Sequence, residues 1–297
     1  MLIEFSELNK HFFNITNIFV EKQISDGKTR FIMHEPRPTD ALLLFANTTG
    51  VCYQKNMNPI YIPHGALVYM PQNCHYVWEN SPIESSNTQE NLLFEFTLND
   101  INTTRDNSEK NTLISTKNIG EHISFSKSVS VITTRHSALY KSLMYNLIDA
   151  FEKYKDSPLP VYCAAYEMFN TLSNNCRIEQ KNNSDIGFIK NSIKYLEDCT
   201  LPQKSIKEIA EGCNISISYY ERLFKNYAGV SPTEYRHIHR INQIKMFLQE
   251  GKISLDEAAE KMGYCDSGYL CRFFKKQTGM TPKEYKRIYH LQTEKSL

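Results

Sequence analysis

The sequence predicts an α+β protein of two domains, with a strand-rich N-terminal half and an all-helical C-terminal half. The chain has 297 residues, which is more than one hydrophobic core usually organises. Short apolar runs bounded by Pro, Gly, Asn and Asp fill residues 16–97, whereas residues 186–290 follow the helical period throughout. The C-terminal half also contains a repeat at an offset of 50 residues, as the pair Tyr219 and Tyr269 shows.

The first domain, residues 1–178, is predicted to begin as a small antiparallel barrel or sandwich. The segment from Ile60 to Trp78 has the form strand, Pro-His-Gly turn, strand, Pro-Gln-Asn turn, strand. Polar stretches at residues 80–91 and 99–111 are interpreted as loops. This spacing of short strands is typical of small all-β units.

Two helices are expected after Arg135, followed by a polar linker over residues 179–185. The first helix has apolar residues at a spacing of four, namely Leu139, Leu143, Leu147 and Phe151. This stripe favours either packing onto the strands or dimerisation with a second copy of the chain, and the sequence leaves both open. The linker is polar throughout, as expected between domains.

The second domain, residues 186–297, begins with a helix at residues 186–198, and its later helices have clear start and stop signals. Ser205 and Ser254 each precede a Glu by three residues, which is the pattern of a capping box. Pro232 opens a long helix that Gly251 closes, and Pro282 opens the last helix.

Each repeat has the parts of a helix-turn-helix motif. A short helix containing a small Ala is followed by a turn at Asn214 or Gly263, and these residue types tolerate the left-handed backbone that the turn needs. The second helix of such a motif lies in the major groove, where Arg reads guanine and Lys binds phosphates. The residues predicted to contact DNA are Ser218, Tyr219, Glu221, Arg222, Lys225, Ser267, Gly268, Cys271, Arg272, Lys275 and Lys276.

The helix between the repeats predicts how the two motifs are spaced on double-stranded DNA. At 1.5 Å per residue, its 19 residues span about 28 Å, close to the roughly 34 Å of one turn of DNA. A solenoid is the alternative use of a helical repeat, but it usually needs at least three units. The sequence therefore favours two recognition helices in successive major grooves.

The segment GYCDSGYLCRFFKKQTGMTPKEYKR resembles the signature of the AraC/XylS family of transcription regulators. The resemblance covers residues 186–290, with Tyr264 and Leu270 in place of the usual Phe and Lys286 in place of Arg. It implies a regulator, usually an activator, that works with RNA polymerase. Gly268 and Cys271 stand where family members often carry longer base-reading side chains, which leaves Arg272 as the main reader of the second motif.

The segment GALVYMPQNCHYV is similar to part of a cupin, which implies a cupin-like effector-binding barrel followed by a dimerising helical pair. Aromatic and His side chains are expected to line the effector pocket, namely His34, Tyr61, Tyr69, His75 and Trp78. Barrel-core packing is the alternative role for these aromatic residues. Metal-binding cupins also need a His-x-His pair and a Glu upstream of this segment, and neither is recognisable there, so we expect no metal and no cofactor.

Three modes of action remain open at this stage. The first is a regulator controlled by a small effector, and the second is a regulator controlled by a protein antagonist or by its own abundance. The third, an enzyme of the cupin type or an alkyl-acceptor with a reactive Cys, lacks its ligand or Cys cluster, so no catalytic residue is predicted. Cys265 and Cys271 flank the second recognition helix and are candidates for oxidation, with an inert role as the alternative.

The composition of the chain indicates where the protein is located more clearly than it indicates what the protein binds. The formal net charge is +1, but residues 184–297 have 18 Lys+Arg against 14 Asp+Glu, whereas the rest of the chain has 16 against 19. This basic excess is a weak indication of nucleic-acid binding. The eight Cys are scattered, and neither a signal peptide nor a membrane-spanning run is recognisable. We therefore expect a cytoplasmic protein with reduced thiols.

Overall fold

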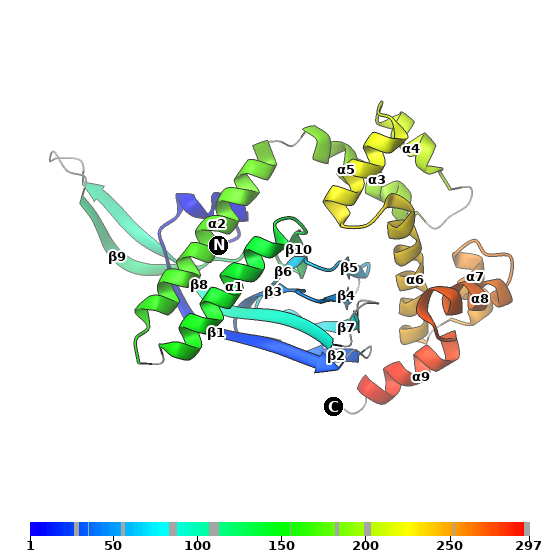
Figure 1. Cartoon of the computed structure of the whole chain (residues 1–297), viewed down its shortest axis with the longest axis horizontal. Coiled ribbons are helices and arrows are strands. Elements are labelled where there is room, and N and C mark those ends of the chain that lie inside the picture. The colour runs from blue at the N-terminus through cyan, green and yellow to red at the C-terminus, as the bar shows by residue number, and fades with distance from the viewer. Residues whose placement is uncertain are drawn as a thin grey trace.

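The computed structural model describes the chain except for residues 27–29, 35, 55–56, 83–87, 107–112, 155, 182–183, 199–202, 252 and 294–297. A strand-rich half and a helical half lie side by side, and the long helix α6 runs along the boundary between them (Figure 1). This confirms the predicted division into a β-rich N-terminal region and a helical C-terminal region. In the part that the structure describes, no helix is long and apolar enough to cross a membrane.

The N-terminal half contains two antiparallel sheets. The larger has the order β1-β8-β3-β6-β10, with β9 pairing with β8, and the smaller has the order β2-β7-β4-β5. The strands of the larger sheet are β1 (Phe13–Asp26), β3 (Asp40–Leu44), β6 (Leu67–Met70), β8 (Thr88–Asp106), β9 (Leu113–His122) and β10 (Ser130–Thr133). Those of the smaller sheet are β2 (Arg30–His34), β4 (Thr48–Tyr53), β5 (Ile60–Ile62) and β7 (Tyr76–Pro82).

Large side chains fill the space between the two sheets. Trp78 packs against Phe45 and Tyr76, with ring centroids 5.4 Å away in each case. Residues of both sheets join this cluster, including Met70 and Leu93, and all five side chains are buried. The three strands predicted between Ile60 and Trp78 are confirmed. The described pairings give two separate sheets rather than the closed barrel that the sequence led us to expect, and the cupin likeness stays a prediction.

The two polar stretches interpreted as loops are mostly strand, so that prediction was wrong. Residues 88–106 form one strand, β8, whose second half pairs with β9 from Asn99 to Asp106 in a hairpin that projects from the molecule (Figure 1). Residues 83–87 and 107–112 lie outside the described part. Thr and Ile are β-branched and favour extended backbone, so these residues form strand although many of their neighbours are polar.

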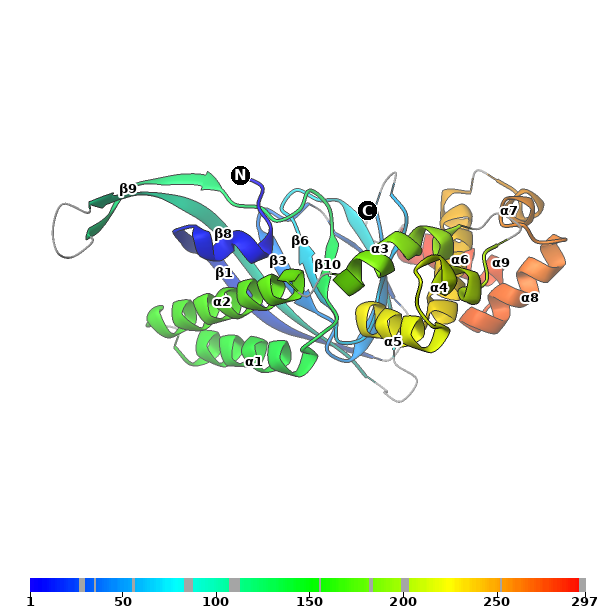
Figure 2. The same ribbon diagram turned by 90° about the horizontal axis from the view of Figure 1, so that it is seen from above.

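Two helices, α1 (Ser137–Lys153) and α2 (Leu159–Lys181), cover the outer face of the larger sheet (Figure 2). Leu143 and Leu147 are buried in the core between helix and sheet, as the core-packing alternative expected. Phe151 packs partly against the same core, and Leu139 is exposed. Helix α2 continues into the predicted linker, because Arg, Glu, Gln and Lys are good helix formers.

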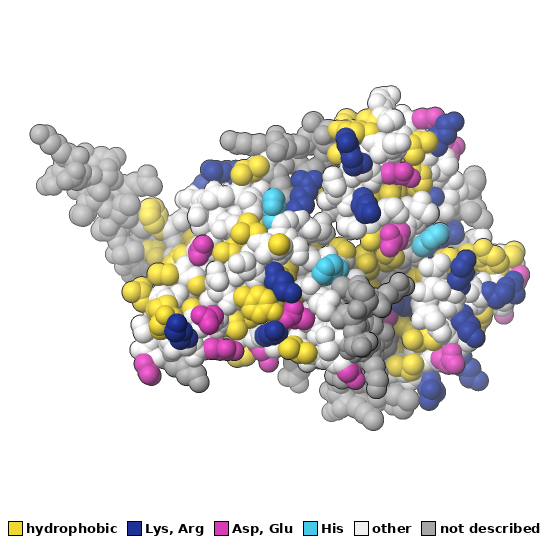
Figure 3. Space-filling model, viewed as in Figure 1, with side chains coloured by type: hydrophobic (Ala, Val, Ile, Leu, Met, Phe, Trp, Pro, Cys, Tyr) yellow, Lys and Arg dark blue, Asp and Glu magenta, His cyan; other side chains and the backbone are white. Residues whose placement is uncertain are grey.

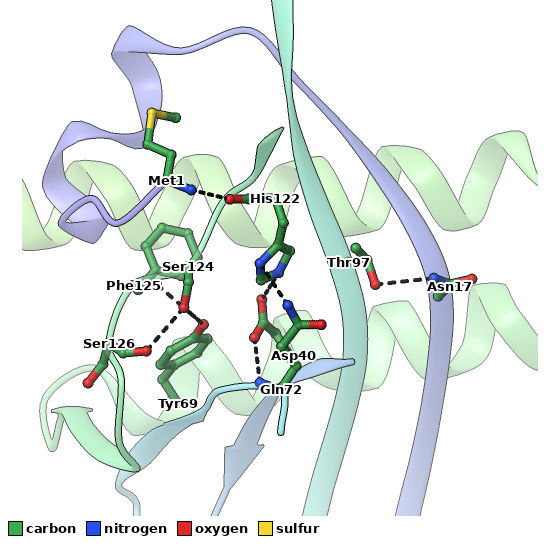
Figure 4. A network of polar contacts seen from close by, with 10 residues as sticks. All are labelled: Met1, Asn17, Asp40, Tyr69, Gln72, Thr97, His122, Ser124, Phe125 and Ser126. Atoms are coloured by element: carbon green, nitrogen blue, oxygen red, sulfur yellow. Dashed lines mark hydrogen bonds and ion pairs between the residues drawn. The ribbon is translucent and has the colours of Figure 1, made fainter. Parts of the chain in front are cut away.

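A polar network fastens the N-terminus to the larger sheet (Figure 4). The terminal ammonium donates to the carbonyl oxygen of His122 at 2.5 Å, and the Nε2 atom of His122 lies 2.8 Å from Oδ2 of Asp40. The other Asp40 oxygen accepts from the backbone N–H of Gln72 at 2.8 Å. Burial raises the pKa of the Asp40 carboxyl above its usual value, while these partners oppose the shift.

The C-terminal half consists of two helical units with separate hydrophobic cores. Helices α3 (Ser184–Glu197), α4 (Ile206–Gly212) and α5 (Ile217–Ala228) surround one core, which includes Tyr220 and Phe224. Helices α7 (Leu255–Lys261), α8 (Ser267–Thr278) and α9 (Pro282–Thr293) surround the other, which includes Leu270 and Phe274. Helix α6 (Pro232–Glu250) joins the units with the predicted bounds.

Candidate nucleic-acid interface

The first helix-turn-helix unit has the caps and the turn that its sequence predicts. Ser205 and Glu208 form a complete capping box at the start of α4. Asn214 has φ of 56°, the left-handed conformation that turns the chain between α4 and α5. Ser216 then caps α5, and Gly229 ends it at φ of 78°. These local signals fix where the recognition helix begins and ends.

The second unit repeats this construction. Ser254 and Glu257 form the capping box of α7, and Gly263 takes the left-handed turn at φ of 69°. Asp266 caps α8 in place of the Ser at the equivalent position of the first unit, and Gly279 ends the helix at φ of 77°. The predicted helix-turn-helix repeat is therefore confirmed as structure in both copies.

The residues predicted to contact DNA lie on open faces of α5 and α8. On α5, Tyr220 and Phe224 are buried in the core of the unit, so the opposite face points away from it. The exposed residues are Ser218, Glu221, Arg222, Lys225, Gly268, Arg272, Lys275 and Lys276, whereas Tyr219, Ser267 and Cys271 are half-buried. Basic side chains are spread over the surface of this half of the molecule (Figure 3).

Each recognition helix pairs its central Arg with a Tyr one turn earlier. The guanidinium of Arg222 lies 5.2 Å from the ring centroid of Tyr219, and that of Arg272 lies 6.0 Å from the ring of Tyr269. Such cation–π contacts hold a guanidinium in place at small cost. Tyr269, which is 46% exposed, was missing from the predicted set, although its repeat partner Tyr219 was in it.

The start of α8 brings an acidic group close to Arg272. The Oδ1 atom of Asp266 accepts from the backbone N–H of Tyr269 at 2.6 Å, and this bond, with a smaller contribution from Arg272, lowers the pKa of the carboxyl. A Cβ atom at Gly268 would lie 2.9 Å from Oδ1 of Asp266. Gly268 therefore leaves room for the Asp266 cap, which gives a structural reason for a Gly at this position.

The predicted effector residues do not gather in one cavity. Trp78 is buried between the sheets, while Tyr69 faces the opposite side of the larger sheet, where its hydroxyl lies 2.9 Å from Oγ of Ser124. His75 is exposed, and the side chain of His34 lies outside the described part. Only Tyr61, among the four whose side chains are described, lines a cavity between the two halves.

Two cavities lie at the junction of the halves. The larger, about 680 Å³, is lined by the β5–β6 region, the segment that leads into α1, and the ends of α5 and α6, including Tyr61, Arg135 and Tyr235. The smaller, about 390 Å³, is lined by residues of β4, β7, α6, α8 and α9. Both cavities mix polar and apolar groups, as ligand sites commonly do.

The described residues contain no cluster of three or more His, Cys, Asp or Glu side chains arranged to hold a metal ion. All seven cysteines in the described part of the chain are free thiols. The Cys265 thiol is exposed and donates to Oδ2 of Asp266 at 3.3 Å, whereas Cys271 is half-buried. Oxidation of either thiol stays a prediction.

Comparison with known proteins places the helical half in a family. Residues 209–288 match a family model described as a helix-turn-helix domain. Comparison with curated proteins gives no match. Among solved structures, the C-terminal domain of AraT, a response regulator from Geobacillus stearothermophilus, is 25% identical over 34% of this chain and 84% of its own, with a TM-score of 0.30.

Two further solved structures are similar. A protein of unknown function from Listeria innocua is 33% identical over 34% of this chain and 95% of its own, with a TM-score of 0.28. An apo ToxT variant from Vibrio cholerae is 13% identical over 92% of this chain and 98% of its own, with a TM-score of 0.31.

Two capped helix-turn-helix units joined by one helix define a DNA-binding transcription regulator, and the family model runs from α4 into α9 and so includes both recognition helices. Together with the signature around Arg272, the match identifies residues 209–288 as a DNA-binding domain of the AraC/XylS type. At the level of the family, proteins with this domain are DNA-binding proteins rather than enzymes.

Proposed function

We propose that the protein regulates transcription by placing α5 and α8 in two successive major grooves of double-stranded DNA. The observation that carries this proposal is the equivalence of Arg222 and Arg272, which lie exposed at the same position of both recognition helices, each beside a Tyr. Arg is the commonest bidentate reader of guanine. The helix α6 between them has 19 residues, about 28 Å at 1.5 Å each.

Selection from a random double-stranded DNA library tests this proposal directly. The full chain should enrich sites with two short conserved elements whose centres are about 10.5 base pairs apart. Hydroxyl-radical footprinting of such a site should show two protected patches on one face of the DNA. A library that shows no enrichment, or a site with a single protected patch, would contradict the two-groove arrangement.

We further propose that a small effector controls the regulator by binding at the junction of the two halves. The side chains of Phe45, Trp78 and Tyr76 fill the space between the sheets, which argues against the barrel pocket expected from the sequence. The cavity of about 680 Å³ has the size of a small-molecule site and is lined by both halves. A ligand there can have different affinities for different arrangements of the halves, which control by an effector requires.

Thermal melting of the full chain against sugars, aromatic acids and fatty acids tests the effector proposal. A ligand that binds only the folded protein should stabilise it by about 2.7 kcal/mol at 100 times its dissociation constant. Tyr61→Ala, which changes the lining of the cavity, should weaken that shift, whereas the exposed control His75→Ala should not. No shift with any compound would favour the alternative, control by a protein antagonist or by abundance, which the filled sheet interior also supports.

The remaining parts of the proposed function concern assembly and the direction of regulation. Activation, with RNA polymerase as partner, is proposed from the family alone. Dimerisation through the N-terminal half is proposed from the exposed outer surface of α1 and α2, where Leu139 is 42% and Leu159 69% exposed. Leu143 and Leu147 do not belong to this surface, because they are buried beneath it.

A further inference from the structure

A buried carboxylate of the smaller sheet is held by side chains of the DNA-binding half. Glu79 in β7 is 3% exposed. Its Oε1 atom accepts from Nζ of Lys245 at 2.5 Å, and its Oε2 atom accepts from the hydroxyls of Tyr53 at 2.7 Å and Tyr285 at 3.0 Å. A charge removed from water is costly unless such partners compensate for it. Glu79 therefore depends on the contact between the halves.

The partners come from both sides of the junction and are themselves buried. Glu79 and Tyr53 belong to the smaller sheet, whereas Lys245 lies on α6 and Tyr285 on α9. Lys245 is 8% and Tyr285 is 1% exposed. Gln249, one turn beyond Lys245, donates to the Tyr285 hydroxyl at 2.8 Å. Burial and the nearby Glu79 raise the pKa values of both phenols, so they remain hydrogen-bond donors.

The repeat shows that this contact is a special feature of the second unit. Tyr235, the equivalent of Tyr285 in the first unit, donates to Oε1 of Glu197 at 2.9 Å, so its acceptor lies in its own unit on α3. Tyr285 instead donates to Glu79 of the smaller sheet, and the α6 side chain that contacts its hydroxyl, Gln249, is a donor to it. The second unit thus obtains from the N-terminal half the carboxylate that the first unit supplies for itself.

A second contact joins the N-terminal half to the first unit. The Thr134 hydroxyl donates to the carbonyl oxygen of Tyr227 at 3.0 Å, at the end of α5. Close by, a Cβ atom at Gly229 would lie 3.1 Å from Pro63. The N-terminal half therefore contacts both helix-turn-helix units, one through backbone at the end of α5 and the other through the buried ionic cluster. The contact with α5 also includes Arg135, whose Nε atom donates to the carbonyl oxygen of Asn226 at 3.5 Å, but only the ionic cluster contains a buried pair of opposite charges.

We propose that Tyr53, Glu79, Lys245 and Tyr285 form an interdomain latch that holds the DNA-binding half against the smaller sheet, and that opening this latch strengthens DNA binding. The direction follows from charge. When the latch is closed, Glu79 pairs with Lys245 and neutralises its charge. The latch also keeps residues 1–183, with a net charge of −3, beside residues 184–297, with a net charge of +4. Acidic charge near the DNA-binding surface weakens the attraction of that surface to phosphates. The proposed effect on DNA binding rests on the proposed DNA-binding function, whereas the existence of the latch does not.

The latch is tested by the distance between spin labels at two exposed positions of the full chain, Glu167 in α2 and Lys283 in α9. Glu79→Gln leaves Lys245 buried without its counter-charge, so the distance distribution should become longer and broader. Lys245→Met removes the partner on the DNA-binding half and should lengthen and broaden the distance distribution in the same way. Because the two variants lie in different halves, an effect that they share does not come from misfolding of one domain. The charge exchange Glu79→Lys with Lys245→Glu should restore a narrow distribution.

The repeat offers a matched control for the hydroxyl groups. Tyr285→Phe removes a donor to Glu79 and should broaden the distribution, whereas Tyr235→Phe removes the equivalent hydroxyl within the first unit and should leave it unchanged. An unchanged distance in both Glu79→Gln and Lys245→Met would overturn the latch. So would equal broadening by the two Tyr variants, because the effect would then not be specific to the interdomain contact.

Fluorescence anisotropy with a selected DNA site tests the consequence for binding. Glu79→Gln and Lys245→Met should each bind at least about fivefold more tightly, the lower end of common coupling effects. If variants whose label distances show an open latch bind DNA no more tightly than the unaltered protein, the latch does not restrain DNA binding. If the unaltered protein binds no selected site, the proposed function fails, and the label distances still decide whether the latch exists.

Discussion

Replacing either Arg222 or Arg272 with Ala should cost about 1–3 kcal/mol of binding free energy at a cognate site, about a fivefold to 150-fold loss of affinity. Each Arg is exposed on its recognition helix and steadied by a neighbouring Tyr ring. The two residues lie in separate units with separate cores, so the costs should add in the double variant. Each single variant should also relax base preference in only one of the two conserved elements of the site.

Two Lys variants separate base reading from general attraction to DNA. Lys275→Ala on α8 should weaken binding to all sequences alike and lower the slope of log affinity against log salt by about 1. Lys194→Ala on α3 is the control, because it removes the same charge from an exposed position outside the helix-turn-helix motifs. If both Arg variants bind the selected site as the unaltered protein does, α5 and α8 are not the reading helices.

The helical half was predictable because its signals are local. The caps at Ser205 and Ser254, the left-handed turns at Asn214 and Gly263, and the Pro that opens α6 each act within a few residues of the chain. The repeat then doubled every signal, so that two copies of one pattern supported the same interpretation. For the same reason the bounds of α6 agree with the sequence to the residue.

The faces of the central strands were not predictable in this way. Every residue of β6, including Tyr69, is buried, because the larger sheet is covered by the smaller sheet on one side and by α1 and α2 on the other. A strand buried on both faces has no alternation of polar and apolar residues. The sequence therefore does not show that Tyr69 and Trp78 lie on opposite sides of the larger sheet. The predicted effector set mixed the two faces for this reason.

Glu79 illustrates a second limit. Glu79 lies in strand β7, and the residues next to it in the sequence do not mark it as buried. Its partners Lys245 and Tyr285 are 166 and 206 residues further along the chain. A charged residue in a strand is normally read as facing solvent. No local pattern in the sequence joins residues this far apart, so the contact of Glu79 with the second unit was not predictable.

The separate cores of the two units lead to the prediction with the largest effect on stability. Phe274 and Phe224 are equivalent in the repeat, both are 0% exposed, and truncating a buried Phe to Ala costs about 3–5 kcal/mol. We expect each variant to destabilise its own unit, which urea unfolding followed by circular dichroism would show as an early transition. In a hydroxyl-radical footprint, Phe224→Ala should lose the patch of DNA that α5 protects. Phe274→Ala should lose the patch that α8 protects.

The two variants should differ in their effect on the N-terminal half. The Phe274 ring packs edge-on against Tyr285, with centroids 5.6 Å apart, and Tyr285 donates to Glu79. The Phe224 ring packs in the same way against Tyr235, whose acceptor is Glu197 in its own unit. Phe274→Ala should therefore also lengthen the distance between labels at Glu167 and Lys283, whereas in Phe224→Ala the latch should hold. Equal lengthening in both variants would mean that the two units unfold together and that their cores are not energetically separate.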